Sequence, residues 1–77
     1  MQTQRAAVDT ARERLTEALA RLPERRRVAL MMFDAEGYSH AEIAEVLGVP
    51  EGTVRSDVFH ARRAMRAHTV TLLWLAA

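Results

Sequence analysis

The stretch from Tyr38 to Met65, YSHAEIAEVLGVPEGTVRSDVFHARRAM, decides the fold of this chain, because it has the pattern of two helices joined by a tight turn. Ser39 and Glu42 have the spacing of a capping box, in which each side chain accepts a hydrogen bond from the other residue's backbone amide. Gly48 suits the left-handed residue that ends many helices, and Pro50 suits a helix start. The pattern therefore predicts a helix-turn-helix. The expected helices cover about residues 39–47 and 50–67.

The second of these helices has one apolar face and one basic face. Four apolar side chains recur at helical spacing and should face the core: Val54, Val58, Ala61 and Met65. The opposite half of the helical wheel carries four arginines and no acid: Arg55, Ser56, Phe59, Arg62, Arg63 and Arg66. Asp57 falls at the border of the apolar stripe, so it need not point towards a phosphate.

The basic face indicates nucleic-acid binding. A run of arginines is by itself more often a solvated surface. Here, however, the arginines lie on a capped helix-turn-helix together with an exposed Phe59, which gains nothing in water. In a DNA groove Phe59 can meet a thymine methyl group, while arginines contact guanine edges or phosphates.

Composition limits the remaining classes of function. The chain has 77 residues, enough for one small domain. Its 11 basic residues, all arginine, nearly balance 10 acids, so the net charge of +1 gives no bulk attraction to nucleic acid and only local clusters count. The absence of cysteine excludes disulfides and thiolate chemistry. Three scattered histidines build no catalytic cluster or metal-ligand spacing, so we expect no enzyme, no metal and no cofactor.

No signal peptide or membrane span is expected. The first residues are polar, and the most apolar segment, 70–77, is far shorter than the roughly 20 residues of a spanning helix. A cytoplasmic location without a membrane partner fits these features. The tail, 69–77, would expose a costly apolar patch if it stayed free. Folding back on the first helix is the favoured interpretation; pairing with a second copy or binding in a partner's groove are the alternatives.

The first half of the chain predicts two further helices. Residues from about 3 to 22 are rich in good helix formers and carry an apolar stripe. Pro23 disfavours helical geometry at the residue before it and suits the start of a second helix, which Gly37 should cap after about residue 36. The stripe of the first helix comprises Ala11, Leu15, Ala18, Leu19 and Leu22.

The second helix, over about 23–36, is apolar on two sides, with Leu30 and Phe33 opposite the other apolar residues. A helix of this kind is usually buried between neighbours. We therefore expect it at the centre of an all-α, four-helix domain with a C-terminal helix-turn-helix. A second hypothesis is that Leu30 or Phe33, with part of the first helix, forms a groove that binds a partner protein.

Three motifs occur together in one order: LPERR from Leu22, EGYSHAEIAEVLGVPEGTVRS from Glu36, and HARR from His60. Together they resemble region 4 of bacterial sigma factors, and more narrowly that of the extracytoplasmic-function group. The resemblance covers about residues 11–66. It implies a winged-helix-like, all-α architecture without a wing.

The resemblance also implies a function. Such a domain reads the upstream, minus thirty-five promoter element through its last helix and docks on the β flap of RNA polymerase, as a specificity subunit and not an enzyme. An anti-sigma factor is a further expected partner. By position, the family's DNA-reading residues correspond to Thr53, Arg55, Ser56, Phe59 and His60, and its phosphate partners to Arg62 and Arg63.

Three departures from the family pattern weaken this expectation. Met32, Phe33 and Asp34 stand where Leu-Arg-Glu is common, and Asp57 and His60 stand where arginine is frequent. Each lost phosphate contact lowers DNA affinity at physiological salt, so the domain alone should bind DNA weakly. Nothing corresponds to the family's region 2, so we expect a C-terminal piece of a longer factor.

Two alternatives stay open. One is a sigma-like interaction module, held by an anti-sigma factor or mimicking a sigma factor, with little DNA binding; Phe33, Asp57 and His60 favour it, and the four arginines of the last helix oppose it. The other is a LuxR-type response-regulator effector domain, which shares the four-helix plan and the Glu-Gly-Thr-Val motif. The segment SDVFHARR, from Ser56, fits the sigma pattern better.

Overall fold

The computed structural model describes residues 2–68, and within that range it contains helices and no strand. The prediction of an all-α, four-helix domain is therefore confirmed, whereas the predicted folding back of the tail, 69–77, lies outside the described residues. The α-helices are α1 (Gln2–Ala20), α2 (Glu24–Leu30), α3 (His40–Leu47) and α4 (Glu51–Ala64). A π-helical segment, η1 (Met31–Ala35), continues α2, and a 3₁₀ turn, η2 (Arg66–His68), follows α4.

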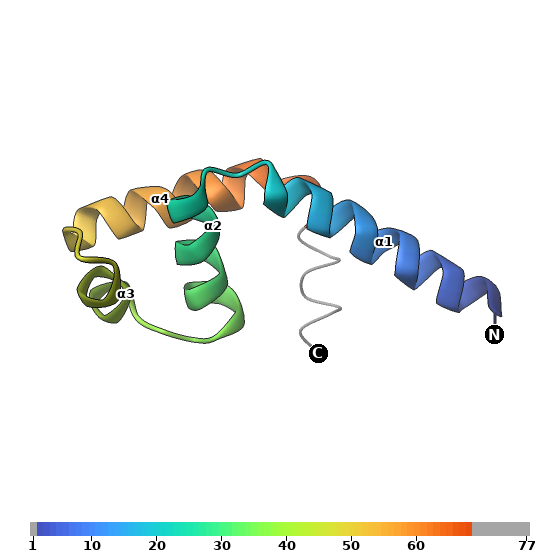
Figure 1. Cartoon of the computed structure of the whole chain (residues 1–77), viewed down its shortest axis with the longest axis horizontal. Coiled ribbons are helices and arrows are strands. Elements are labelled where there is room, and N and C mark those ends of the chain that lie inside the picture. The colour runs from blue at the N-terminus through green and yellow to red at the C-terminus, as the bar shows by residue number, and fades with distance from the viewer. Residues whose placement is uncertain (1, 69–77) are drawn as a thin grey trace.

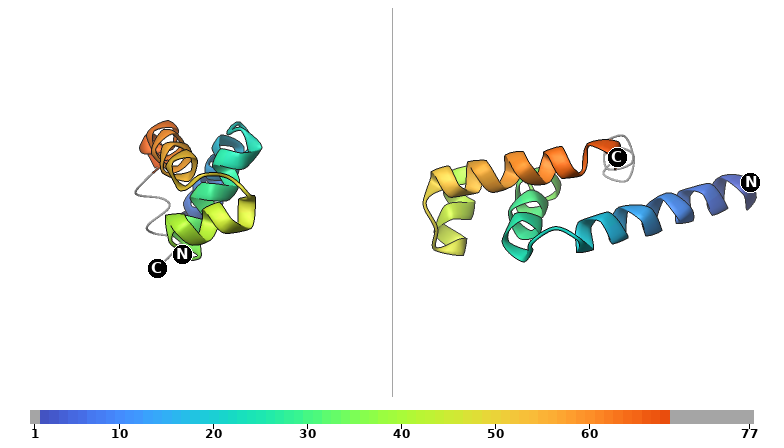
Figure 2. Two further views of the ribbon diagram at one scale, coloured as in Figure 1. Left: turned by 90° about the vertical axis from the view of Figure 1, so that its left-hand side faces the viewer. Right: turned by 90° about the horizontal axis from the view of Figure 1, so that it is seen from above.

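Helices α2, α3 and α4 form a compact unit, and α1 extends away from it with the N-terminus at its far end (Figures 1 and 2). Both α2 and α3 pack against α4. The residues of α1 that join the core come from its C-terminal half: Leu15, Ala18 and Leu19.

Two hydrophobic clusters make up the core, and α2 belongs to both. The first unites α1, α2 and the end of α4 through Leu15, Leu22, Leu30, Ala61 and Met65. The second lies within the helix-turn-helix and comprises Ala29, Ile43, Ala44, Val54 and Val58. Because the neighbours Ala29 and Leu30 enter different clusters, α2 lies at the centre of the domain, as its two apolar sides predict. The apolar stripe of α4 is buried, as predicted.

Leu30 corrects one prediction. Its side chain is only 1% exposed and packs with Leu15 and Leu22, so it lines no surface groove. Burying a leucine contributes about 1.5–3 kcal/mol to folding, which is the better account of an apolar residue on this face of α2. Leu30 is therefore a core residue and not a partner contact in this structure.

The second predicted helix, 23–36, differs from expectation in its last turn. Pro23 lies just before α2, and the helix changes to π geometry at Met31, where the Glu36 amide donates to the Met31 carbonyl over 3.1 Å. Gly37, with φ +77°, then ends the segment, and the Tyr38 amide donates to the Met32 carbonyl over 3.0 Å. Glycine as the terminator was predicted; the wider turn was not, and π turns recur at functional sites.

The helix-turn-helix forms as its local signals predict. The Glu42 amide donates to Ser39 Oγ and the Ser39 amide donates to Glu42 Oε1, each over 3.0 Å, which completes the capping box. Gly48 is left-handed at φ +67°, and α4 begins directly after Pro50. Only the end of α4 was predicted too late: it stops at Ala64, and the 3₁₀ turn takes over the remaining residues.

Candidate nucleic-acid interface

The outer face of α4 borders a groove of about 640 Å³. Two of the predicted DNA-reading residues, Arg55 and Phe59, meet there with both predicted phosphate partners. The side chains that line the groove are His40, Arg55, Val58, Phe59, Arg62, Arg63 and Arg66. Phe59 is the large exposed hydrophobic residue among them, with 59% of its surface exposed. A groove with four arginines and one exposed ring has the chemistry that base edges and phosphates require.

The other predicted residues lie on α4 but outside the lining of this groove. Thr53 is half-buried near the start of α4, whereas Ser56 and His60 are exposed. The His60 ring meets the edge of Phe59, with ring centroids 5.4 Å apart. His60 is therefore an exposed neighbour of Phe59 outside the lining of the groove.

His40 is the groove residue that the sequence analysis missed. It begins α3 and stacks on Phe33 with ring centroids 4.2 Å apart. The wheel of α4 could not include it, because it belongs to the neighbouring helix. Its place directly after the Ser39 cap was the available signal, since the start of the first helix of a helix-turn-helix lies beside the recognition helix.

Arg55 pairs with an acid of its own helix. Its Nη2 lies 2.7 Å from Glu51 Oε1, one turn earlier, and both side chains are largely exposed. Exposed pairs of this spacing are weak, since water screens the charges and two long side chains must be held still. Arg55 is therefore easily released towards a ligand.

Arg62 is held more firmly, by Asp34 of η1. Its Nε donates to Asp34 Oδ2 over 2.9 Å, and its Nη2 donates to Asp34 Oδ1. The guanidinium also lies over the Phe33 ring, 5.0 Å from the centroid. The hydrogen bonds to Asp34 raise the pKa of Arg62, an effect that partial burial opposes. Asp34 thus occupies the donors with which Arg62 was predicted to bind phosphate.

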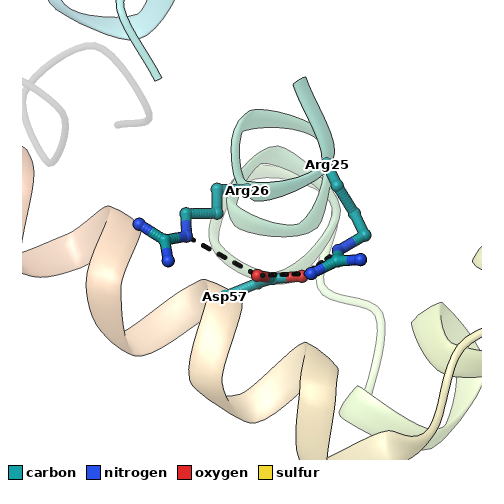
Figure 3. A network of polar contacts seen from close by, with 3 residues as sticks. All are labelled: Arg25, Arg26 and Asp57. Atoms are coloured by element: carbon teal, nitrogen blue, oxygen red, sulfur yellow. Dashed lines mark hydrogen bonds and ion pairs between the residues drawn. The ribbon is translucent and has the colours of Figure 1, made fainter. Parts of the chain in front are cut away.

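Asp57 does not line the groove, and its carboxylate joins α4 to α2 (Figure 3). Its carboxylate is buried, with the residue 3% exposed, and accepts from Arg25 Nε over 2.6 Å and from Arg25 Nη2 over 3.3 Å. Arg26 Nε lies 3.6 Å from Asp57 Oδ1. The hydrogen bonds to Asp57 and its negative charge raise the pKa of Arg25. The acid that departs from the family pattern is therefore an internal ion-pair partner.

Within residues 2–68, no group of three or more His, Cys, Asp or Glu side chains could hold a metal ion. None of the helices described there is long and apolar enough to cross a membrane.

Comparison with known proteins agrees with this geometry. The family model "Sigma-70, region 4" matches residues 12–65, most of the chain. The chain therefore belongs to the sigma-70 region 4 family. Within that family it is related to the extracytoplasmic-function (ECF) group, and the match favours this interpretation over a LuxR-type effector domain.

Three curated relatives illustrate the relationship. The ECF RNA polymerase sigma factor SigM of Mycobacterium tuberculosis is 47% identical over 57 residues, covering 74% of this chain and 29% of the relative. The RNA polymerase sigma-H factor of Pseudomonas aeruginosa is 45% identical over 49 residues, covering 64% and 25%. The ECF RNA polymerase sigma-E factor of Escherichia coli is 46% identical over 44 residues, covering 57% and 23%. The chain thus spans less than a third of these relatives, and no solved structure matches it.

Proposed function

We propose that this chain is the promoter-recognition domain of an alternative sigma factor of the ECF group. The observation that carries the proposal is the groove along α4, in which four arginines surround an exposed Phe59 on a capped helix-turn-helix. The names of the relatives, which are RNA polymerase sigma factors, supply the biological setting.

In this proposal α4 enters the major groove of the minus thirty-five element. A B-form major groove is about 12 Å wide and admits one α-helix. Arg55, Ser56 and Phe59 then face base edges from the front of α4. Thr53 flanks them near the start of the helix, and His60 flanks them on one side. Arg62 and Arg63 lie towards the phosphates.

The same domain would bind protein partners. A sigma factor acts with RNA polymerase, so we propose docking on the β flap and, in the inactive state, on an anti-sigma factor. Phe33 keeps part of its surface exposed and stays a candidate partner contact, whereas Leu30 does not because it is buried. Docking would place the groove of α4 beside upstream promoter DNA.

A second candidate function is a sigma-like interaction module with little DNA binding. The observation that favours it is the pairing of two groove arginines with acids, Arg55 with Glu51 and Arg62 with Asp34. Paired arginines contribute less positive potential to the groove. The groove also contains the exposed side chains of Arg63 and Phe59, so DNA reading remains our first proposal.

Selection of DNA from a duplex library tests the proposal. The chain is incubated with duplexes whose central positions are randomised, and the enriched sequence is compared with a scrambled duplex of the same composition at several salt concentrations. The proposal expects tighter binding to the enriched duplex and a steep loss of affinity with salt. Equal affinity for both duplexes, together with binding to a β-flap fragment, would instead support the interaction module.

A further inference from the structure

Asp34 and Arg62 meet across the edge of the groove, although 28 residues separate them in sequence. The carboxylate presents two oxygens to the guanidinium fork, as a phosphate group would. The Phe33 ring lies against the guanidinium and is in turn stacked on His40. Arg62 is therefore held on two sides, by an anion and by an aromatic face.

Both residues that hold Arg62 belong to the π turn of η1. Phe33 and Asp34 are adjacent in this turn, which comprises Met31–Ala35. Successive residues of a regular helix point about 100° apart. In this segment, however, Phe33 and Asp34 both reach the side chain of Arg62.

A paired Arg62 is a poor phosphate ligand for an electrostatic reason. Binding to DNA draws on the release of counterions, which requires net positive charge beside the phosphates. If Arg62 stays on Asp34, the pair is neutral and adds little to this term. If Arg62 moves to a phosphate, it must give up its two hydrogen bonds to Asp34, which offsets the gain. In either state the Asp34 carboxylate lowers the affinity of the groove for DNA.

We propose that Asp34 is an internal competitor of the DNA backbone for Arg62, and that it thereby sets the affinity of the domain for DNA without reading bases. The proposal rests on the promoter-binding function proposed above. It assigns Asp34, a residue outside the helix-turn-helix, to the control of that function. Because the competition concerns phosphates, it affects all duplex sequences alike.

Substitution Asp34→Asn tests the proposal in the full chain. Asparagine keeps the size of the side chain but removes the charge, so Arg62 becomes available to a phosphate. With one more phosphate contact, the slope of log affinity against log salt should steepen by about 0.9. Affinity should rise on the order of threefold at moderate salt for the enriched and the scrambled duplex alike. Thermal unfolding confirms that the variant is folded, and Asp34→Ala serves as a second variant with the same expected direction.

Two controls separate competition for Arg62 from a general charge effect. Glu36→Gln removes an exposed acid two residues further along the chain and should change affinity less than Asp34→Asn does. In an Arg62→Ala background, Asp34→Asn should raise DNA affinity much less, because the arginine for which Asp34 and the phosphate compete is gone. An Asp34→Asn variant with unchanged affinity and salt slope would overturn the proposal. An equal gain from Glu36→Gln, or an undiminished gain in the Arg62→Ala background, would overturn it too.

The same titrations keep the two proposals apart. Promoter reading is measured by the ratio of affinities of the wild-type chain for the enriched and the scrambled duplex. The role of Asp34 is measured by the ratio of affinities of variant and wild type for one duplex. A wild type without sequence preference whose Asp34→Asn variant binds more tightly would refute promoter reading and support the competition.

Discussion

Removal of the buried Asp57 carboxylate should destabilise the domain. Asp57 is 3% exposed and accepts two hydrogen bonds from Arg25, so Asp57→Ala removes charge-assisted bonds between α2 and α4. Hydrogen bonds to a charged group are typically worth about 1.5–3 kcal/mol, and we expect a loss of about 2 kcal/mol. For a domain of this size each kcal/mol lowers the melting temperature by about 4–8 °C. The expected decrease is therefore about 8–16 °C, measured by far-ultraviolet circular dichroism.

A matched control and a double variant complete this experiment. Glu45→Ala removes an exposed acid from α3 and should change stability by less than about 0.5 kcal/mol. Arg25→Ala should destabilise the wild type, because it leaves the buried carboxylate with the more distant Arg26 alone. The same change should have little further effect in Asp57→Ala, since the partner has gone. If Asp57→Ala has the same melting temperature as the wild type, or if the stability losses of the two substitutions are additive, the ion pair does not join α2 to α4.

Three further predictions concern the helix-turn-helix. Gly48→Ala should cost about 1–2 kcal/mol in urea unfolding, because φ +67° strains a residue with a Cβ although no atom lies near enough to clash; an unchanged midpoint would contradict this reasoning. The hydrogen bond from the Ser39 amide lowers the pKa of Glu42 below its ordinary 4.5. The stability that this bond contributes is therefore fully present above pH 4.5, and it is lost as the pH falls through the lower pKa that Glu42 has in the folded state. Glu42→Gln should flatten the acid limb of the stability profile, and an equally steep profile would refute the assignment. Phe59→Ala should leave stability within about 0.5 kcal/mol of the wild type but reduce selectivity for the enriched duplex, whereas equal selectivity would exclude a base contact for this exposed ring.

The helix-turn-helix could be predicted from sequence because its signals are local. The Ser39 and Glu42 cap, the left-handed Gly48 and the apolar stripe of α4 each depend on residues within a few positions of one another. Helix periodicity alone also separates the buried face of α4 from the basic one. The fold class and the arginines and Phe59 of the groove follow from these patterns, whereas His40 of α3 does not.

Contacts between distant segments could not be predicted in this way. The sequence placed Asp57 at the border of the core but gave no sign of Arg25, which lies 32 residues away and reaches it only through the packing of α2 on α4. Likewise, a helical wheel places Leu30 on an apolar face of its helix but does not identify the residues of other segments that cover it. The contact of Asp34 with Arg62, 28 residues away, has no local sequence signal either, so a residue predicted to bind phosphate proved to be paired within the domain.

The most direct test of the central claim is the binding of three chains to the enriched and the scrambled duplex: the wild type, Arg55→Ala and Arg12→Ala. Arg12 is an exposed arginine of α1, so its substitution removes the same charge away from the groove. The account predicts that Arg55→Ala loses most of the preference for the enriched duplex, while Arg12→Ala keeps it. An Arg55→Ala chain that retains the full preference would contradict promoter reading by α4.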